Sequence, residues 1–304
     1  MSVSIQNVSK FYGSQKALDD VSFEVNSGQV VGFLGPNGAG KSTMMKIITC
    51  FIPQSSGNVK VEGHDVIEES VEVRKNVGYL PEHNPLYLDM YIKEYLSFVA
   101  AIHLPSPLIN QRVKEMIDLT GLGPEQHKKI GALSKGYRQR VGLAQAMIHH
   151  PKVLILDEPT SGLDPNQLRD IRELIRSIGQ EKTVILSTHI MQEVEAICNR
   201  VIIINKGKIV ADDDTKILRM KGTSGNTVIV EFDRAVDLNK VKTLPEIISA
   251  QLIENNTYRI TGQEGMDVRP VLFRFAVDNS ITVMTLQQEG GSIESIFQQL
   301  TAGE

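Results

Sequence analysis

The sequence of 304 residues has little cysteine, no strong excess of either charge and no long apolar run. Cys50 and Cys198 form no CxxC pair, which excludes a zinc module of the usual spacing and a disulfide scaffold. The formal net charge of −4 gives no basic excess, so no dedicated nucleic-acid binder is indicated. No stretch reaches the roughly 18 consecutive apolar residues of a membrane helix. Residues 1–10 lack a basic segment followed by an apolar one, so we expect no signal peptide and a soluble chain in the reducing cytoplasm.

The apolar pattern of the first two thirds predicts an α/β domain, which we place at residues 1–221. Strand-like runs alternate with helical patterns there, as is typical of a mostly parallel sheet. Helical spacing from about 83 to 150 predicts a helical subdomain inserted into that domain. The expected strands are 29–34, 153–156, 184–186 and 201–204, with a helix at 41–48.

A Gly/Ser-rich linker at 221–226 introduces a second domain, residues 222–304, which we expect to be a small α+β domain of ferredoxin-like type. Its expected strands are 227–232, 248–254, 258–261 and 281–286. Ile293, Ile296, Phe297 and Leu300 have the spacing of an amphipathic closing helix, expected to pack on its own domain. This domain shows no catalytic constellation. It could regulate the first domain, support dimerisation or extend the fold.

A phosphate-binding loop is the strongest single motif. Residues 35–43 fit GxxxxGK[ST] between a predicted strand and a predicted helix. Glycines let backbone N–H groups surround phosphates, Lys41 reaches the β- and γ-phosphates, and the Ser42 hydroxyl suits Mg²⁺. A plain Gly-rich turn is the alternative, which the flanking elements disfavour. The loop residues are Gly35, Pro36, Asn37, Gly38, Ala39, Gly40, Lys41, Ser42 and Thr43.

Two adjacent carboxylates follow the apolar run at 153–156. Asp157 at the end of a strand can hold Mg²⁺ through water, and Glu158 then lies near an attacking water. An acidic pair alone is often only a solvated loop. The phosphate loop upstream makes a catalytic pair the stronger interpretation.

These motifs and the segments after them resemble the nucleotide-binding subunits of ABC transporters over about residues 2–212. Residues 133–139 read LSKGYRQ where that family prefers the LSGGQ signature, and residues 161–164 match its D-loop. The resemblance makes His189, in Ser187-Thr188-His189, the switch histidine, and it makes Tyr12 the aromatic residue that stacks on adenine. It implies a P-loop NTPase of ABC type that uses ATP and Mg²⁺.

The same resemblance implies a head-to-tail dimer, formed with a second copy or with a homologue. Each ATP would lie between Lys41 of one chain and Ser134 and Gly136 of the other. Glu158 would polarise the attacking water and His189 would position the γ-phosphate. The implied catalytic residues are Lys41, Glu82, Glu158 and His189, and the implied Mg²⁺ ligands are Ser42, Glu82 and Asp157.

Two positions depart from the family pattern. Glu82 stands where a glutamine is usual; its carboxylate can still bind Mg²⁺ but adds charge. Lys135 replaces the first signature glycine, and it could place positive charge near the partner's γ-phosphate or point to solvent. Ser134 and Asp164 also suit plain helix N-caps, besides their implied roles across the dimer.

The absence of a membrane segment, taken with the resemblance, implies a separate permease subunit that contacts residues 82–95. The chain would then be cytoplasmic and peripheral on the inner face of the cell membrane, with no nucleic-acid partner. Glu82 in YLPE and the segment 292–301 resemble export-type subunits of the drug and polysaccharide class. More narrowly, the chain resembles ATP-binding subunits of gliding-motility-associated transporters.

Two other classes remain open. One is a soluble ABC-type ATPase acting on ribosomes or DNA, and the other is a nucleotide sensor that does not hydrolyse ATP. The adjacent His149 and His150 diverge if helical, so we expect no metal site there.

Overall fold

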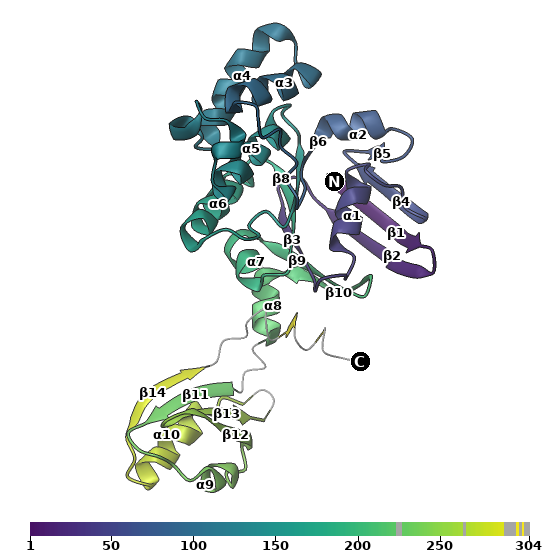
Figure 1. The fold of residues 1–304 in the computed structure, drawn as a ribbon. Coiled ribbons are helices and arrows are strands. Elements are labelled where there is room, and N and C mark those ends of the chain that lie inside the picture. The colour runs from purple at the N-terminus through teal and green to yellow at the C-terminus, as the bar shows by residue number, and fades with distance from the viewer. Residues whose placement is uncertain (223–226, 264–265, 289–295, 298–299, 301–304) are drawn as a thin grey trace. The chain divides into compact units, whose positions relative to one another are not determined.

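The computed structural model describes residues 1–222, 227–263, 266–288, 296–297 and 300 (Figure 1). The chain forms two compact units, Met1–Thr215 and Lys216–Glu304. No helix in these described ranges is both long enough and apolar enough to span a membrane.

A six-stranded sheet in the order β10-β9-β3-β8-β7-β6 forms the centre of the first unit. Every residue of β3, β7 and β8 is buried, as expected for parallel strands covered on both faces. The parallel neighbours are β9 (Arg200–Asn205), β3 (Val30–Leu34), β8 (Thr183–Thr188), β7 (Val153–Asp157) and β6 (Val77–Leu80), while β10 (Lys208–Asp214) is antiparallel to β9. This arrangement confirms the predicted α/β class.

A second sheet of the first unit is antiparallel and was not among the predicted elements. It has the order β2-β1-β4-β5, with β1 (Val3–Tyr12), β2 (Gln15–Val25), β4 (Ser56–Val61) and β5 (His64–Asp65). Register shifts interrupt β1 between Ile5 and Val8 and again between Val8 and Lys10. Such bulges break the alternation of buried and exposed residues by which a half-buried strand is recognised. The predicted mostly parallel sheet is therefore present as the six-stranded sheet, and the antiparallel sheet is an addition that the sequence did not reveal.

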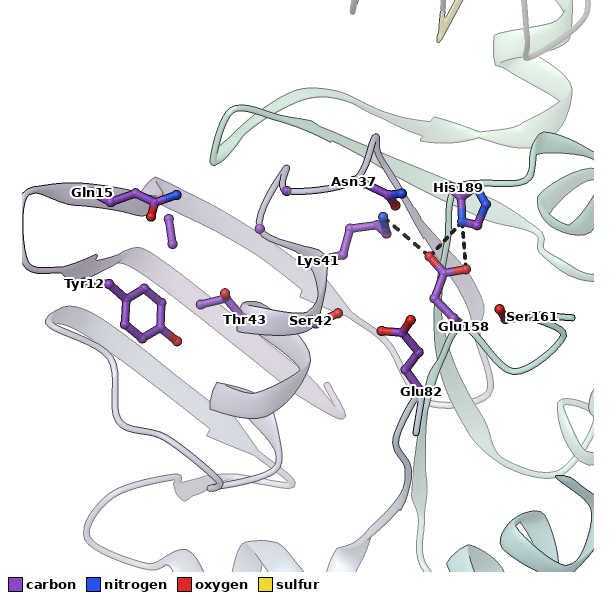
Figure 2. Close-up of a pocket in the computed structure, with 13 residues that line it drawn as sticks. Tyr12, Gln15, Asn37, Lys41, Ser42, Thr43, Glu82, Glu158, Ser161 and His189 are labelled. Atoms are coloured by element: carbon purple, nitrogen blue, oxygen red, sulfur yellow. Dashed lines mark hydrogen bonds and ion pairs between the residues drawn. The ribbon is translucent and has the colours of Figure 1, made fainter. Parts of the chain in front are cut away.

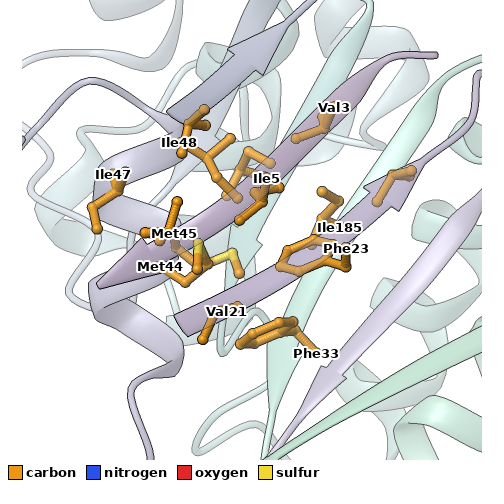
Figure 3. Close-up of a cluster of buried hydrophobic side chains, with 14 of the residues drawn as sticks. Val3, Ile5, Val21, Phe23, Phe33, Met44, Met45, Ile47, Ile48 and Ile185 are labelled. Carbon is orange, nitrogen blue, oxygen red and sulfur yellow. The ribbon is translucent and has the colours of Figure 1, made fainter. Parts of the chain in front are cut away.

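Helix α1 (Lys41–Ile48), whose bounds the sequence predicted, joins the two sheets. It contacts β2 and β4 of the antiparallel sheet and β7 and β8 of the parallel one. Met44, Met45, Ile47 and Ile48 are buried in the core beside Phe33 (Figure 3). The helix is thus held by apolar packing against both sheets.

The predicted helical region contains three α-helices. α3 (Ile92–His103) contacts α4 (Ser106–Leu119) and α5 (Lys135–Met147), and α5 also packs on β6. The remaining helices of the first unit are α2 (Ser70–Asn76), η1 (Gly123–Glu125), η2 (Ile130–Ala132), α6 (Pro165–Ile178) and α7 (Met191–Ile197).

The second unit contains a four-stranded sheet in the order β12-β13-β11-β14, with antiparallel neighbours throughout. Phe232, Tyr258, Ile260 and Leu272 are buried in its separate core. Its elements are β11 (Thr227–Phe232), α9 (Leu238–Lys242), β12 (Ile247–Glu254), β13 (Thr257–Gly262), α10 (Arg269–Asp278) and β14 (Val283–Gln288).

Three expectations for the C-terminal part change. Lys221 and Gly222 of the predicted linker instead end α8 (Thr215–Gly222), and 223–226 lie outside the described residues. α9 and α10 were not predicted; exposed Phe273 and Val277 on α10 obscure its apolar stripe. Of the predicted closing helix, Ile296, Phe297 and Leu300 are helical, whereas Ile293 lies outside the described residues.

Candidate functional site

The phosphate loop connects β3 to α1 and is shaped by glycines. Gly38 and Gly40 have φ values of 80° and 110°, a region that favours glycine. A Cβ at Gly40 would lie 2.6 Å from the Ala17 carbonyl oxygen, and one at Gly35 would lie 2.5 Å from that of Ile204. The loop therefore packs directly on the backbones of β2 and β9, which holds its N–H groups in place at the helix N-terminus.

Lys41 lies at the centre of this loop and is only 6% exposed. Its Nζ donates to the Gly35 carbonyl oxygen at 2.8 Å and to that of Pro36 at 3.3 Å. The same Nζ lies 3.5 Å from Oε1 of Glu158. A buried cation is thus aimed at the space enclosed by the loop.

Glu158 follows β7 and has a left-handed backbone, with φ 50°. Its carboxylate oxygens lie 3.0 and 2.9 Å from Nδ1 of His189 (Figure 2). An ionised carboxylate only accepts hydrogen bonds, so Nδ1 carries the proton in this contact. Strained backbone at a polar cluster is typical of functional sites. The carboxylate is therefore held between an ammonium group and an imidazole.

Ser42 and the buried Asp157 lie side by side and are joined by a hydrogen bond. Oδ1 of the buried Asp157 accepts a hydrogen bond from the Ser42 hydroxyl at 3.2 Å and another from the Ser187 hydroxyl. Carboxylate and hydroxyl oxygens suit Mg²⁺, which is usually held by one or two carboxylates together with substrate phosphates. Within the described ranges, no group of three or more His, Cys, Asp or Glu residues could hold a metal without such help.

Most of these groups line a cavity of about 610 Å³. This volume is within the usual range for small-molecule sites. Tyr12, 49% exposed, lies at the end of this cavity away from Glu158, and Glu82 lies near Ser42 and Glu158 (Figure 2). The lining residues are Tyr12, Gln15, Ala17, Asn37, Gly38, Gly40, Lys41, Ser42, Thr43, Glu82, Glu158, Ser161 and His189.

Sequence reasoning did not assign Gln15, Ala17 or Ser161 to the site. Gln15 and Ala17 belong to β2, a strand of the unpredicted sheet, and their residue types carry no chemical signal. Ser161 stands in the D-loop segment, which could have identified it.

Several predicted residues are not among those that line the cavity: Gly35, Pro36, Ala39, Ser134, Lys135, Gly136, Asp157 and Asp164. Ser134 caps α5 by accepting from the Tyr137 N–H at 3.4 Å. Asp164 caps α6 by accepting from the N–H groups of Asn166 and Gln167, both at 3.0 Å. Both N-cap predictions are therefore confirmed.

Near these caps the start of α5 lies against the loop before α6. The Lys135 ammonium group occupies the space beside Gly162, whose φ is 68°. A Cβ at Gly136 would lie 2.7 Å from the Gln167 side chain. The signature and D-loop segments thus form one surface of the first unit.

His149 does not line the cavity, and its contacts are with packed side chains and backbone. Its ring stacks on His103 with centroids 4.5 Å apart, and its Nε2 lies 3.1 Å from the Val77 carbonyl oxygen. Burial, together with the nearby His103, lowers the pKa of His149 to about 4. The ring is therefore neutral near pH 7 and packs between α3 and β6.

Comparison with known proteins finds relatives that are named as ABC transporter or transport ATP-binding proteins. The family model "ABC transporter" matches residues 18–161. An uncharacterized ABC transporter ATP-binding protein of Bacillus subtilis, YdbJ, is 33% identical over 98% of this chain and 94% of its own length. The bacitracin transport ATP-binding protein BcrA of Bacillus licheniformis is 31% identical over 99% of this chain and 97% of its own.

A solved structure agrees with these relatives. It is the dimeric, post-hydrolysis state of the ATP-binding cassette MJ0796 bound to ADP and Pi, with 25% identity and a TM-score of 0.64. The match covers 70% of this chain and 98% of that one.

Proposed function

The chain belongs to the family of ABC transporter ATP-binding proteins and is an ATPase, and from this premise we propose that it powers a separate membrane-spanning exporter. The observation that carries the proposal is the contact of Glu158 with both Lys41 and His189 at the phosphate loop. A base, a cation and a hydrogen-bonding imidazole at one phosphate site are the groups that hydrolysis of a nucleoside triphosphate requires.

In the proposed binding mode the triphosphate lies along the loop 35–43 and the adenine stacks on Tyr12. Lys41 exchanges its contacts with the Gly35 and Pro36 carbonyl groups and with Glu158 for the β- and γ-phosphates, because the phosphates carry more negative charge than these partners. Ser42, Asp157 and Glu82 offer the oxygens that suit Mg²⁺. When bound, Mg²⁺ neutralises charge that develops on the phosphates.

The proposed chemistry assigns Glu158 to the attacking water and His189 to the γ-phosphate. Freed from Lys41, the carboxylate accepts the water proton as the water oxygen bonds to the γ-phosphorus. The bond between that phosphorus and the bridging oxygen breaks, ADP leaves with this oxygen, and the imidazole holds the phosphate in line. Most of the rate comes from such positioning and electrostatic stabilisation.

The proposed active form is a dimer of two ATPase domains. Ser134, Lys135, Gly136 and Asp164 do not line the cavity of their own chain, which suits a role at the cavity of a partner. The dimeric state of the MJ0796 cassette also supports this assembly. Each chain would then supply Lys41 to one ATP and Ser134 to the other.

An exposed aromatic cluster supports docking of a permease near residues 82–95. Tyr87, Tyr91 and Phe98 are each about half exposed, and the rings of Tyr87 and Phe98 lie 6.0 Å apart. Exposed apolar patches of this kind mark interaction sites. The chain would then work on the cytoplasmic face of the membrane.

BcrA is named for bacitracin transport, and this name supports an antibiotic-like cargo for the proposed transporter. Gliding motility is a narrower proposal, which rests only on the resemblance of the whole chain to ATP-binding subunits of gliding-motility-associated transporters, whereas YLPE at 79–82 and the segment 292–301 support export. None of the relatives described above is named for motility.

The proposed functional domains are residues 1–221 and 222–304. A ferredoxin-like second domain is supported by its element order of strand, helix, strand, strand, helix, strand. We assign it an accessory role, because the ATP-site residues all lie in the first domain.

The test is an affinity pull-down of the Glu158→Gln protein from detergent-solubilised membranes with ATP present. We expect recovery of a polytopic membrane protein, and its loss when Tyr87 and Phe98 are both replaced by serine. Recovery of ribosomes or DNA with an intact ATP-bound dimer would instead support a soluble ATPase and overturn the exporter assignment.

A further inference from the structure

A second carboxylate, Glu193, lies behind the site and has no place in the chemistry above. It belongs to α7 and has 0% exposure. The Thr160 hydroxyl donates to its Oε1, and the Thr188 hydroxyl donates to its Oε2 at 2.6 Å. Burying a carboxylate is costly, so a carboxylate held by two hydroxyl groups points to a specific structural demand.

The two threonines lie next to the two reacting groups, Thr160 after Glu158 and Thr188, the last residue of β8, before His189. Thr188 immediately precedes His189, and its oxygen also accepts from the Ile190 N–H at 3.0 Å. His189 is therefore anchored on both sides through one hydroxyl group.

Thr160 stands in the turn that follows Glu158. The Ser161 N–H donates to the Glu158 carbonyl oxygen at 3.2 Å, and the Leu163 N–H donates to that of Thr160 at 3.3 Å. Figure 2 shows both Ser161 and His189 near the Glu158 carboxylate.

We propose that Glu193 is a positioning residue for ATP hydrolysis, which ties the Glu158 turn to the His189 loop. The inference rests on the proposed roles of Glu158 and His189. One carboxylate with two acceptor oxygens fixes the separation of the two loops, and thereby keeps the His189 imidazole within hydrogen-bond reach of Glu158 and of the γ-phosphate.

A carboxylate suits this position better than an amide because two hydroxyl groups donate to it. Each of its two oxygens takes one hydroxyl hydrogen, whereas glutamine has one acceptor oxygen and presents N–H groups to the other threonine. The hydroxyl hydrogen of that threonine then loses its carboxylate acceptor, and the remaining hydrogen bond is neutral instead of charge-assisted, so glutamine leaves one loop less firmly held. Misplacement of a catalytic group by about 1 Å can cost ~100-fold in rate.

The experiment compares Glu193→Gln in the full chain with the same change at exposed Glu173 on α6. We expect kcat for ATP hydrolysis to fall about 10- to 100-fold in Glu193→Gln, with ATP affinity changed less than about 3-fold. Glu173→Gln should leave both values unchanged.

A double-mutant cycle separates positioning from a general structural effect. In a His189→Ala background, Glu193→Gln should cost less than about 3-fold further in kcat, because the group it positions is gone. An equal loss in both backgrounds would overturn the proposal.

A second pair of variants covers the case in which Glu193→Gln fails to fold. Thr188→Val removes the hydroxyl at similar volume, whereas Thr188→Ser retains it. Thr188→Val should lose about 10-fold more in kcat than Thr188→Ser, since only serine can bridge Glu193 to Ile190. Equal kcat in these two variants would contradict the proposal.

The result also separates this proposal from the function on which it rests. If Glu158→Gln abolishes turnover while Glu193→Gln leaves kcat intact, only the role of Glu193 is wrong. If the natural chain hydrolyses no ATP, the proposed function itself is wrong.

Discussion

At the scale of single residues, the site depends on a buried cation whose partners can be exchanged. Lys41 is held by two loop carbonyl oxygens and lies near Glu158. Hydrogen bonds to charged groups contribute more than neutral ones, and an anion adds attraction that carbonyl groups do not supply. The pocket is thus arranged to receive phosphate without moving the ammonium group far.

Lys41→Ala should therefore weaken ATP binding by about 10- to 100-fold, which corresponds to loss of one charge-assisted hydrogen bond or two. Isothermal titration of the purified protein with ATP measures this change. Lys46→Ala, on the last turn of the same helix, is the matched control and should bind normally. An unchanged affinity in Lys41→Ala would refute the phosphate-binding role.

Residues of the site were predictable where the chemistry requires a fixed type at a fixed spacing. Lys41, Glu158 and His189 meet in one cavity although 148 positions separate the first from the last. Gln15 was missed because its residue type states nothing about nucleotides. Glu193 was missed because its partners, Thr160 and Thr188, are distant in sequence and carry no motif.

At the scale of helices and strands, the strands that could be predicted from the sequence are the fully buried ones. β3, β7 and β8 are buried along their whole length and read as continuous apolar runs. β1 has a positive φ of 52° at Asn7, and its register shifts there, so neither a continuous nor an alternating pattern survives. Helix α1 was predicted because the phosphate-loop motif is followed directly by a helix.

The contact of β6 with α5 gives a test at this scale. A Cβ on Gly78 would overlap the Ala146 carbonyl group, which is helix backbone that cannot move aside. Gly78→Ala should therefore lower the free energy of unfolding by roughly 1–3 kcal/mol through overpacking.

Urea denaturation of Gly78→Ala beside Gly123→Ala measures this effect. A Cβ at Gly123 meets nothing within 4 Å, so that control should change stability by less than about 0.5 kcal/mol. Equal stability of the two variants would show that β6 and α5 are not packed as described.

The His149 ring at the end of the helical segment predicts a pH dependence of stability. Its folded pKa, about 4 because of burial, lies below the ordinary value of 6.5. As the pH falls, the unfolded chain therefore binds the proton first. The contribution of His149 to stability is complete above pH 6.5 and declines between pH 6.5 and 4.

Between pH 7 and 5 the loss should be about 1–2 kcal/mol, reduced because part of the ring reaches solvent. His149→Gln keeps a donor for the Val77 carbonyl oxygen but cannot titrate, so its stability should fall less over this interval. Urea unfolding at both pH values checks the difference. An identical pH dependence in the two proteins would contradict the assignment.

At the scale of the whole molecule, the chain combines two units with separate cores. The first core contains Phe33 and the buried face of α1, and the second contains Phe232 and Leu272. The cavity is lined only by residues of the first unit. We therefore place the nucleotide chemistry in the first unit and expect it to operate across a dimer of such units.

The role of Glu158 in ATP hydrolysis is tested by comparing the ATP turnover of the purified full chain with that of Glu158→Gln. Loss of a general base should lower turnover by about 100-fold or more, while ATP binding persists because Lys41 and the loop remain. Glu173→Gln should match the natural protein. Turnover in Glu158→Gln close to that of the natural chain would contradict the assignment of Glu158, and with it the mechanism proposed for this site.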